Sequence, residues 1–325
     1  MILAGDIGGT KSNLGLFREE DLRSPLIEAS VHSRDFAGLE QIISDFLVRS
    51  TPFGPVTRAC FGIAGPIVNE CSETPNLPWI VRLKALRALL SIEAVTLIND
   101  LKATGYGLLL LRPDELVTLN TGNVHATGNA ALIAAGTGLG EAILHWNGTR
   151  HEPVASEGGH ADFAPRNDVE IDLLKHLLQR FPHVSYERVL SGPGLFNIYS
   201  FMRDAGYAAE EPSIVEKFKQ LDPSAVISEA ALAGESELCT RALNTFISIY
   251  GAEAGNLALK AMAVAGIYLG GGIAPKIVGK LQEGEFIRAF TAKSRLSVLL
   301  QGIPVHVILN PKTALYGAAR AAMLL

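Results

Sequence analysis

The sequence predicts an α/β fold, and three patterns support that prediction. Residues 2–18 and 131–146 each give a strand, a glycine-containing turn and a second strand. Apolar residues recur at helical spacing over 39–47, and a longer helical pattern covers 235–263. A chain of 325 residues is long enough for two domains, or for one large α/β domain.

The individual elements are predicted from local patterns, with apolar runs marking strands and good N-cap residues marking helix starts. In chain order the expected elements are strands at 2–7, 13–18, 58–64 and 94–98, a helix beginning at Asn99 or Asp100, a polar loop at 118–129, strands at 131–135 and 141–146, mostly helices beyond residue 167, strands at 266–269 and 305–309, and a helix from Thr313. Strands therefore open both halves of the chain.

The two strand–turn–strand segments form an internal repeat. The first turn, at 8–10, reads Gly-Gly-Thr, and the second, at 136–138, reads Gly-Thr-Gly. The residues match weakly, but the order of strand, turn and strand is the same. The repeat predicts two related halves, each with a glycine turn at a corresponding place.

The composition excludes several classes of protein. A net charge of −5 lacks the basic excess of a general nucleic-acid binder, and 19% charged with 48% hydrophobic residues excludes a disordered chain. The longest apolar stretch, 261–269, is shorter than the ~18–20 residues of a membrane span. Cys60, Cys71 and Cys239 form no CxxC pair, and no signal peptide is expected before the first strand. We therefore expect a cytoplasmic protein with no nucleic-acid or membrane partner.

Glycine is the one residue type in clear excess, at 32 of 325 residues against an average of roughly 7%. It is concentrated in segments 5–9, 136–140 and 270–272, each in or directly after an apolar strand. Without a Cβ, such backbone can turn successive N–H groups toward an anion. Any one segment could be an ordinary turn, but three together, two of them with Thr beside Gly, predict a phosphate-binding site.

The familiar glycine signatures do not fit these segments. A P-loop needs Gly-Lys-Ser/Thr, but here Thr10 precedes the lysine and the turn leads to a strand. A dinucleotide fingerprint opens a helix, whereas segment 136–140 has a different last interval and also leads to a strand. The esterase signature fails because Val189 stands where its first glycine is required. The remaining hypothesis is that two β-turns from two halves hold phosphate across a cleft.

Polar residues near these turns are candidates for catalysis or binding. Asp100 follows the strand at 94–98 and is either a helix cap or a general base at the carboxyl end of a strand, where ligands collect. Segment 157–162 offers two carboxylates and an imidazole, which suit either a metal site or the recognition of hydroxyl groups. Glu187 lies near a further glycine-rich turn at 191–194. Taken singly, each of these residues is as well explained by capping or solvation.

Together the motifs resemble the bacterial glucokinase family, within the superfamily of sugar kinases, actin and heat-shock chaperone ATPases. The resemblance runs nearly end to end. Segments 5–10 and 135–140 are similar to the family's two phosphate motifs, 269–273 to its adenosine motif, and 98–100, 157–165 and 187–194 to its sugar-binding segments.

The resemblance implies a two-domain actin-like ATPase fold, of the RNase H-like kind, with the active site in an interdomain cleft. A small α/β domain of residues 1–110 plus 311–325 and a large α/β domain of residues 111–310 are expected. A homodimer is also expected, because dimers are usual in the family.

The implied activity is that of an ATP-dependent glucokinase, which phosphorylates D-glucose at its 6-hydroxyl in the first step of glycolysis, with Mg²⁺ as cofactor. Asp100 is implied as the catalytic base, and Asp6 as the residue that orients Mg²⁺ through water. The residues implied for the sugar hydroxyls are Asn99, Glu157, His160 and Glu187. Those implied for the nucleotide are Gly5, Asp6, Ile7, Gly8, Gly9, Thr10, Thr137, Gly138, Gly271 and Gly272.

One departure concerns Lys11, which follows the Gly-Gly-Thr turn. The related repressor–ORF–kinase family also has lysine here, whereas many glucokinases have Asn at this position. Its side chain could add charge near the phosphates or lie in solvent. That related family usually carries a zinc motif, CxCGxxGC, and its repressors carry an N-terminal helix-turn-helix. Because no cysteine lies between Cys71 and Cys239 and a strand begins at residue 2, we expect neither feature.

Other readings of the fold stay open. One is a kinase for mannose, fructose or an N-acetylated amino sugar, and another is a non-catalytic sugar or nucleotide sensor. A sensor could dispense with Asp100 and with the phosphate turns. A chaperone-like ATPase is disfavoured, because 325 residues leave no room for a substrate-binding domain.

Overall fold

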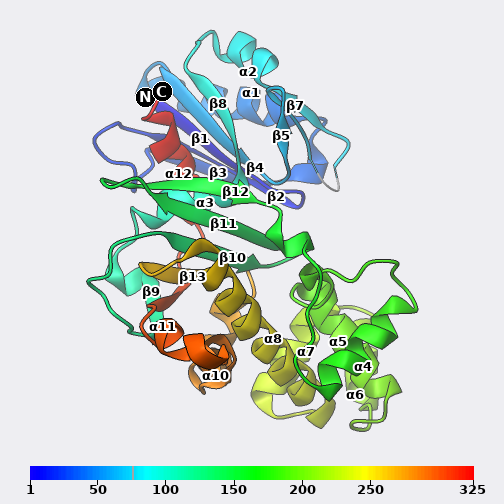
Figure 1. Ribbon diagram of the computed structural model, residues 1–325. Coiled ribbons are helices and arrows are strands. Elements are labelled where there is room, and N and C mark those ends of the chain that lie inside the picture. Colours follow the sequence, from blue (N-terminus) through cyan, green and yellow to red (C-terminus); the bar gives the residue numbers. More distant parts are fainter. Residues whose placement is uncertain (75–76) are drawn as a thin grey trace. The chain divides into compact units, whose positions relative to one another are not determined.

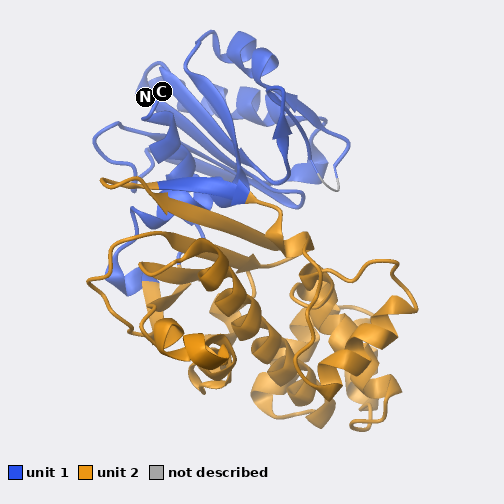
Figure 2. Ribbon diagram, in the orientation of Figure 1, with its two compact units in different colours: residues 1–115, 152–155, 310–325 blue, residues 116–151, 156–309 orange. Residues whose placement is uncertain are grey.

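The computed structural model describes residues 1–74 and 77–325, and the chain divides into two compact units (Figure 2). Unit 1 is made of Met1–Glu115, Glu152–Ala155 and Asn310–Leu325, and unit 2 of Leu116–His151 and Ser156–Leu309. Each unit contains one large β-sheet, and Figure 1 labels most of the strands. Within the described ranges, no helix combines the length and the apolar character needed to cross a membrane.

The large sheet of unit 1 has the strand order β3-β2-β1-β4-β8. Its strands are β1 (Ile2–Ile7), β2 (Lys11–Phe17), β3 (Ile27–His32), β4 (Arg58–Ile63) and β8 (Val95–Asn99). β1 and β2 form an antiparallel hairpin, whereas β1, β4 and β8 run parallel. Ile7, Ile63 and Asn99 are in register, so the turn after β1 and the chain after β8 leave the sheet at the same edge.

Successive side chains of this sheet face opposite layers of helices. The helices of unit 1 are α1 (Leu39–Ser50), α2 (Leu83–Leu90), α3 (Asp100–Leu108) and α12 (Thr313–Ala322). Leu3 and Ile7 belong to a core shared with α1 and α2, and Ile2 and Ala4 to a core shared with α3 and α12. A small antiparallel sheet of β5 (Ile67–Val68), β6 (Cys71–Glu73) and β7 (Ile80–Arg82) completes the unit.

Helices α3 and α12 pack closely because glycine lies where they meet. A Cβ on Gly107 of α3 would collide with the carbonyl oxygen of Thr313, and a Cβ on Gly317 of α12 would collide with that of Ala103. The last helix of the chain therefore presses α3, which begins at Asp100, against the sheet.

The six-stranded sheet, whose strands belong to unit 2 except for most of β12, has the strand order β12-β11-β10-β13-β14-β9. Its strands are β9 (Leu116–Asn120), β10 (Ala130–Ala135), β11 (Leu139–Trp146), β12 (His151–Ser156), β13 (Gly266–Gly270) and β14 (Val305–Ile308). β10 and β11 form an antiparallel hairpin, and β10, β13 and β14 run parallel. The same order and directions occur in β1, β2, β4 and β8, so the predicted relation between the two halves is confirmed at the level of topology.

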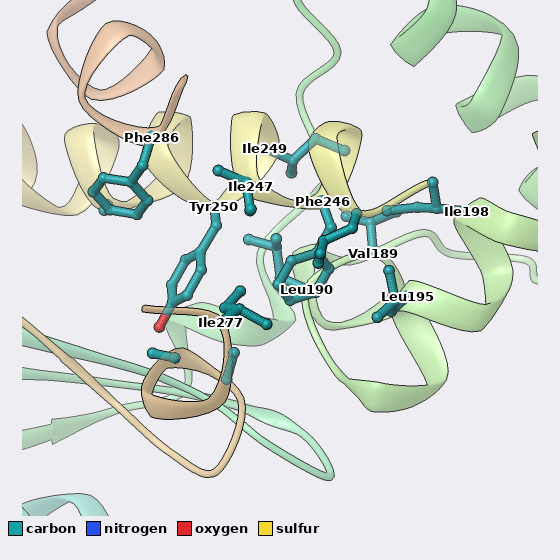
Figure 3. Packing of buried hydrophobic residues seen from close by; sticks show 14 of the residues in the cluster. Val189, Leu190, Leu195, Ile198, Phe246, Ile247, Ile249, Tyr250, Ile277 and Phe286 are labelled. Atoms are coloured by element: carbon teal, nitrogen blue, oxygen red, sulfur yellow. The ribbon is translucent and has the colours of Figure 1, made fainter. Parts of the chain in front are cut away.

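Helix α8 is the centre of the core of unit 2. The helices of this unit are α4 (Asp168–Leu178), α5 (Gly192–Asp204), α6 (Pro212–Phe218), α7 (Pro223–Ala233), α8 (Glu237–Ala261), α9 (Val278–Gln282), α10 (Glu285–Thr291) and α11 (Ser297–Gln301). Phe246 and Tyr250 of α8 pack among the apolar side chains that Figure 3 labels. The Tyr250 hydroxyl donates a hydrogen bond to the Ile133 carbonyl oxygen at 3.2 Å, which ties α8 to β10.

Most of the predicted elements are confirmed, and the differences have physical reasons. β2 begins at Lys11 rather than at residue 13, because pairing with β1 extends up to the turn. The loop expected at 118–129 is wrong in its first part, where β9 pairs with β14 at the edge of the sheet. The structure also adds β3, β12 and the small sheet, whose short or polar strands carry little apolar signal.

Candidate active site

Asp6 lies near the carboxyl end of β1, opposite Asn13 of β2. Asn13 Nδ2 donates a hydrogen bond to Asp6 Oδ2 at 3.2 Å, and Ser30 Oγ donates to Asn13 Oδ1 at 2.6 Å. Burial raises the pKa of Asp6, while the hydrogen bond from Asn13 and the charge of Lys11 lower that pKa in part. The pairing of three strands thus directs one carboxylate beside the first glycine turn.

The turn between β1 and β2 is held from one side. The Gly8 N–H donates to the Lys11 carbonyl oxygen at 3.0 Å, which closes the turn. Ser33 Oγ donates to the Gly8 carbonyl oxygen at 2.7 Å, and the Ser33 N–H donates to the Thr10 carbonyl oxygen at 3.0 Å. Thr10 and Lys11 are exposed, so this part of the turn faces solvent and is accessible to an anion.

Two residues of the same motif face the core. Ile7 is fully buried, and a Cβ on Gly5 would lie 2.6 Å from Cδ1 of Phe61. Glycine at position 5 is therefore required by packing against the Phe61 ring. Only the backbone of these two residues is left to contact a nucleotide.

Asn99 and Asp100 lie where β8 ends and α3 begins. The Asn99 side chain is the helix cap, because its Oδ1 accepts hydrogen bonds from the N–H groups of Leu101 at 2.9 Å and Lys102 at 3.2 Å. Its Nδ2 donates to the Gly65 carbonyl oxygen at 3.4 Å. The capping role considered for Asp100 thus falls to Asn99, and Asp100 is the first residue of the helix.

A glycine in β4 lets α3 approach the sheet at this point. A Cβ on Gly62 would lie 2.8 Å from the Cβ of Ala103 and 3.8 Å from the Cα of Asp100. Asp100 Oδ1 accepts a hydrogen bond from the Leu101 N–H at 2.9 Å. The first turn of α3 therefore carries a carboxylate at the edge where β1 and β8 end.

In unit 2, the second glycine turn and Glu187 form one assembly. The Gly136 N–H donates to the Gly138 carbonyl oxygen at 2.9 Å, so Thr137 lies within a closed turn. Glu187 Oε2 accepts a hydrogen bond from the Leu139 N–H at 3.0 Å. A Cβ on Gly138 would lie 2.5 Å from the same oxygen, so glycine makes room for the carboxylate.

The glycine-rich start of α5 joins this assembly. Ser191 Oγ donates to the Glu187 carbonyl oxygen at 2.7 Å and accepts from the Gly194 N–H at 3.0 Å. The Gly192 N–H donates to the Gly136 carbonyl oxygen at 2.8 Å. The two predicted glycine segments are therefore bonded directly to each other.

The third glycine segment lies beside the second. Gly271 has φ of +79°, and a Cβ there would collide with the Ala135 carbonyl oxygen. The Ile273 N–H donates to that oxygen at 3.2 Å, and a Cβ on Gly136 would lie 3.8 Å from the Gly272 nitrogen. The segments predicted for phosphate and adenosine thus meet within unit 2.

A pocket adjoins this third segment and contains polar residues that were not predicted. Its lining residues are Asp222, Ser224, Ala225, Ser228, Gly272, Ile273, Lys276 and Ile277. Ser224 and Ser228 share one face of α7, and a Cβ on Gly192 would lie 3.0 Å from Ser224 Oγ. Two hydroxyls at helical spacing were a signal in the sequence, but only the fold places them beside Gly272.

Segment 157–160 folds back onto β11. Its last three residues form a 3-10 helix, Gly158–His160, and both Glu157 and His160 are exposed. A Cβ on Gly159 would collide with the Leu139 carbonyl oxygen. The Tyr186 N–H donates to the Ala161 carbonyl oxygen at 2.9 Å, so this segment is bonded to the one that carries Glu187.

Asp162 does not join Glu157 and His160 as a ligand set. Its Oδ1 lies 2.7 Å from Nε2 of His183, and both side chains are exposed. In residues 1–74 and 77–325, no group of three or more His, Cys, Asp and Glu side chains is placed to hold a metal ion. Asp162 is therefore paired with His183.

Known proteins of one family are similar to this chain over nearly its whole length. The family model described as Glucokinase matches residues 3–325. The glucokinase of Trichormus variabilis is 43% identical over 99% of this chain and 98% of its own length, and that of Synechocystis sp. is 40% identical over 98% and 97%.

The solved structures that are similar to this chain identify its fold. The glucokinase of an Antarctic psychrotroph superimposes with a TM-score of 0.85 at 31% identity, over 100% of this chain and 99% of that one. A glucokinase of the repressor–ORF–kinase family from Streptomyces griseus, solved with glucose and AMPPNP, shares the fold at a TM-score of 0.67 and 20% identity, over 100% and 99%. The fold is the two-domain actin-like ATPase fold, and the chain belongs to the glucokinase family.

Proposed function

We propose that this protein is an ATP-dependent glucokinase that phosphorylates D-glucose at the 6-hydroxyl to give glucose 6-phosphate. The observation that carries the proposal is the family match along residues 3–325, which includes all three glycine segments and every polar segment described above. The hydrogen bonds that join 136–138 to Glu187 support it, because they connect a phosphate motif with a sugar motif.

The sugar is proposed to be recognised by the polar side chains of Asn99, Glu157, His160 and Glu187. Carboxylates accept two hydrogen bonds and an imidazole donates or accepts, so Glu157, His160 and Glu187 suit a ring of hydroxyl groups. A hexose that lacks one hydroxyl leaves a partner unpaired, at a cost of about 1–3 kcal/mol. Exposure of Glu157 and His160 supports this role, because both can meet a ligand.

Asp100 is proposed as the general base. It would take the proton of the 6-hydroxyl as that oxygen attacks the γ-phosphorus in line. Its place at the start of α3 supports the role, since capping is already supplied by Asn99. Most of the rate enhancement in such a reaction comes from positioning and charge stabilisation.

The nucleotide is proposed to contact the glycine turns 5–10, 136–138 and 271–272. Backbone N–H groups and the hydroxyls of Thr10 and Thr137 would hold the phosphates. The pocket beside Gly272 is the proposed place of the adenosine, where Lys276 and the serines of α7 offer polar contacts.

Mg²⁺ fits the donor chemistry of Asp6. Mg²⁺ prefers oxygen ligands and keeps several waters, so a single protein carboxylate beside a phosphate turn is enough to orient it. The Asp6 carboxylate is held in one direction by Asn13. When bound, the ion would neutralise charge on the phosphates.

The test is detection of glucose-dependent ADP formation by a coupled assay, with mannose, fructose and N-acetylglucosamine in parallel. Glucose should give the highest kcat/KM. A higher value for another sugar would make the protein a kinase for that sugar, and binding without ADP formation would make it a sensor. A homodimer and a cytoplasmic location are proposed by analogy with the family, and light scattering of the purified chain tests the first.

A further inference from the structure

Glu141 of β11 lies directly behind the segment that carries Glu157 and His160. Its side chain is 2% exposed, and a Cβ on Gly158 would collide with its Oε2. The carboxyl group thus fills the space that the absent side chain of Gly158 leaves. Among the described residues, Oε1 of Glu141 has no hydrogen-bond partner.

Glu253 of α8, fully buried, faces Glu141 and is well supplied with partners. Its Oε2 accepts a hydrogen bond from Asn256 Nδ2 at 2.7 Å, and its Oε1 lies 3.3 Å from Nζ of Lys260. The same Asn256 amide donates to the Tyr186 hydroxyl at 3.1 Å. A cation and an amide donor therefore stabilise a negative charge on Glu253.

Two adjacent buried carboxylates cannot both be charged without strong repulsion. Glu141 has no donor for Oε1, whereas Asn256 and Lys260 both donate to Glu253, so the shared proton belongs on Glu141. Burial first, and then the charge of Glu253, raise the pKa of Glu141 to about 7. A protonated Glu141 is able to donate a hydrogen bond to Glu253.

The pair connects both segments proposed for sugar binding. Glu141 touches the first segment at Gly158. Asn256 Nδ2 donates both to Glu253 and to the hydroxyl of Tyr186, which is the neighbour of Glu187 in the second segment. The two segments are joined further by the hydrogen bond from the Phe163 N–H to the Val184 carbonyl oxygen at 2.9 Å. A change in charge at the pair is thus felt by both segments.

We propose that Glu141 is a positioning residue: protonated and hydrogen-bonded to Glu253, it holds the segments that present Glu157, His160 and Glu187 to the sugar. The inference rests on the proposed function, because it assigns those three side chains to glucose. It goes beyond that function in naming a residue that touches no substrate.

The charged groups around the pair determine what happens when Glu141 loses its proton. Glu253, Lys260 and Tyr250 face it from α8, and Tyr186 of the second sugar segment lies close to Glu253. Lys293 donates a hydrogen bond to Asn256 Oδ1 at 2.5 Å and is attracted by the charge of Glu253. Arg166, whose charge repels Lys293, is paired with Glu170. Lys260 is 57% exposed and already paired with Glu253, so a second negative charge is poorly compensated.

The experiment measures KM for glucose, KM for ATP and kcat from pH 6 to pH 9 in wild type, Glu141→Gln and Glu141→Ala. The control is Glu229→Gln, an exposed carboxylate of α7. In wild type, KM for glucose should rise by about threefold or more above pH 7, and Glu141→Gln should remove that rise while keeping KM at pH 6 within about threefold. Glu141→Ala should raise KM for glucose about tenfold and leave KM for ATP within about twofold.

A further variant, Gly158→Ala, keeps the proposal testable if Glu141→Ala does not fold. Gly158→Ala displaces the same carboxyl from the other side and should also raise KM for glucose. If the wild type is active and Glu141→Gln shows the same pH profile of KM for glucose, the positioning role is overturned and the proposed function is not. A wild type that makes no ADP with glucose at any pH overturns the proposed function and, with it, the positioning of a sugar site.

Discussion

The carboxylate of Glu187 accepts a hydrogen bond from the backbone N–H of Leu139, with 3.0 Å between Oε2 and the nitrogen. Leu139 directly follows the glycine turn 136–138, and Glu187 is one of the side chains proposed for the sugar. If both proposed assignments hold, this one carboxylate acts on both substrates. Glu187 differs in this respect from His160, which makes no hydrogen bond to the turn among the described residues.

Glu187→Ala should weaken the binding of both substrates. Loss of the bond to Leu139 frees the turn that is proposed to hold phosphate, so we expect KM for ATP and KM for glucose each to rise about tenfold or more. His160→Ala is the matched variant and should raise KM for glucose alone. Steady-state kinetics with each substrate varied in turn make the comparison. An unchanged KM for ATP in Glu187→Ala would show that the turn keeps its shape without the carboxylate.

Gly272→Ala tests whether the third glycine segment approaches the nucleotide. Apart from its two neighbours in the chain, no described residue has an atom within 4 Å of a Cβ built there, so the folded state has room for alanine. We expect the Tm to change by less than about 2 °C, while KM for ATP rises because the new methyl group meets the ligand. Gly279→Ala in α9 also has open space and serves as the control, with both quantities unchanged. Equal KM values in the two variants would place the nucleotide elsewhere.

Asp100→Ala should reduce kcat by about a thousandfold or more, because a general base contributes only in the transition state. Glucose affinity, measured by calorimetry without ATP, should stay within about tenfold of wild type. Asn99→Ala is expected to act differently, since it removes the cap of α3 and lowers stability by about 1 kcal/mol. A variant of Asp100 that loses sugar binding and keeps turnover would refute the role of base.

Glu141→Gln should stabilise the protein at alkaline pH. The pKa of Glu141 is about 7 in the folded protein against an ordinary 4.5, so the folded state keeps a proton that the unfolded state loses in this range. Stability therefore falls as pH rises from 4.5 to about 7, and it stays low above that. Glutamine remains neutral, so the variant should gain on the order of 2 kcal/mol over wild type between pH 5 and pH 8. Urea unfolding at both pH values measures the difference, and equal curves at pH 8 would contradict it.

The strands and helices that the sequence predicts are those with a strong local signal. β1, β4 and β8 are short apolar runs, and α8 has a long helical repeat. β9 escaped prediction because its pairing with β14 joins residues nearly two hundred positions apart in the chain, as the register of Thr118 with His306 shows. Long-range pairing leaves no periodic pattern within the strand itself.

The candidate site shows the same division. Its position directly after a strand marks Asp100 as a candidate site residue, and the spacing of the glycines predicts the turns at 8–10 and 136–138. Local sequence does not reveal that Asp162 bonds to His183 or that Asn99 takes the capping role, since each outcome depends on which neighbour is nearest in space. Nothing in the local sequence marks Glu141 as a site residue. Its raised pKa depends on Glu253, which lies on a helix far away in the chain.

The contact between α3 and α12 has a consequence for the synthesis of the chain. Residues 1–115 leave the ribosome long before Thr313–Ala322. Until α12 has been made, it cannot cover the face of the first sheet that contains Ile2 and Ala4. Unit 2 lies between these stretches and is complete once Leu309 has been made. Because domains fold as units during translation, the half of the protein that is started first is the last to be finished.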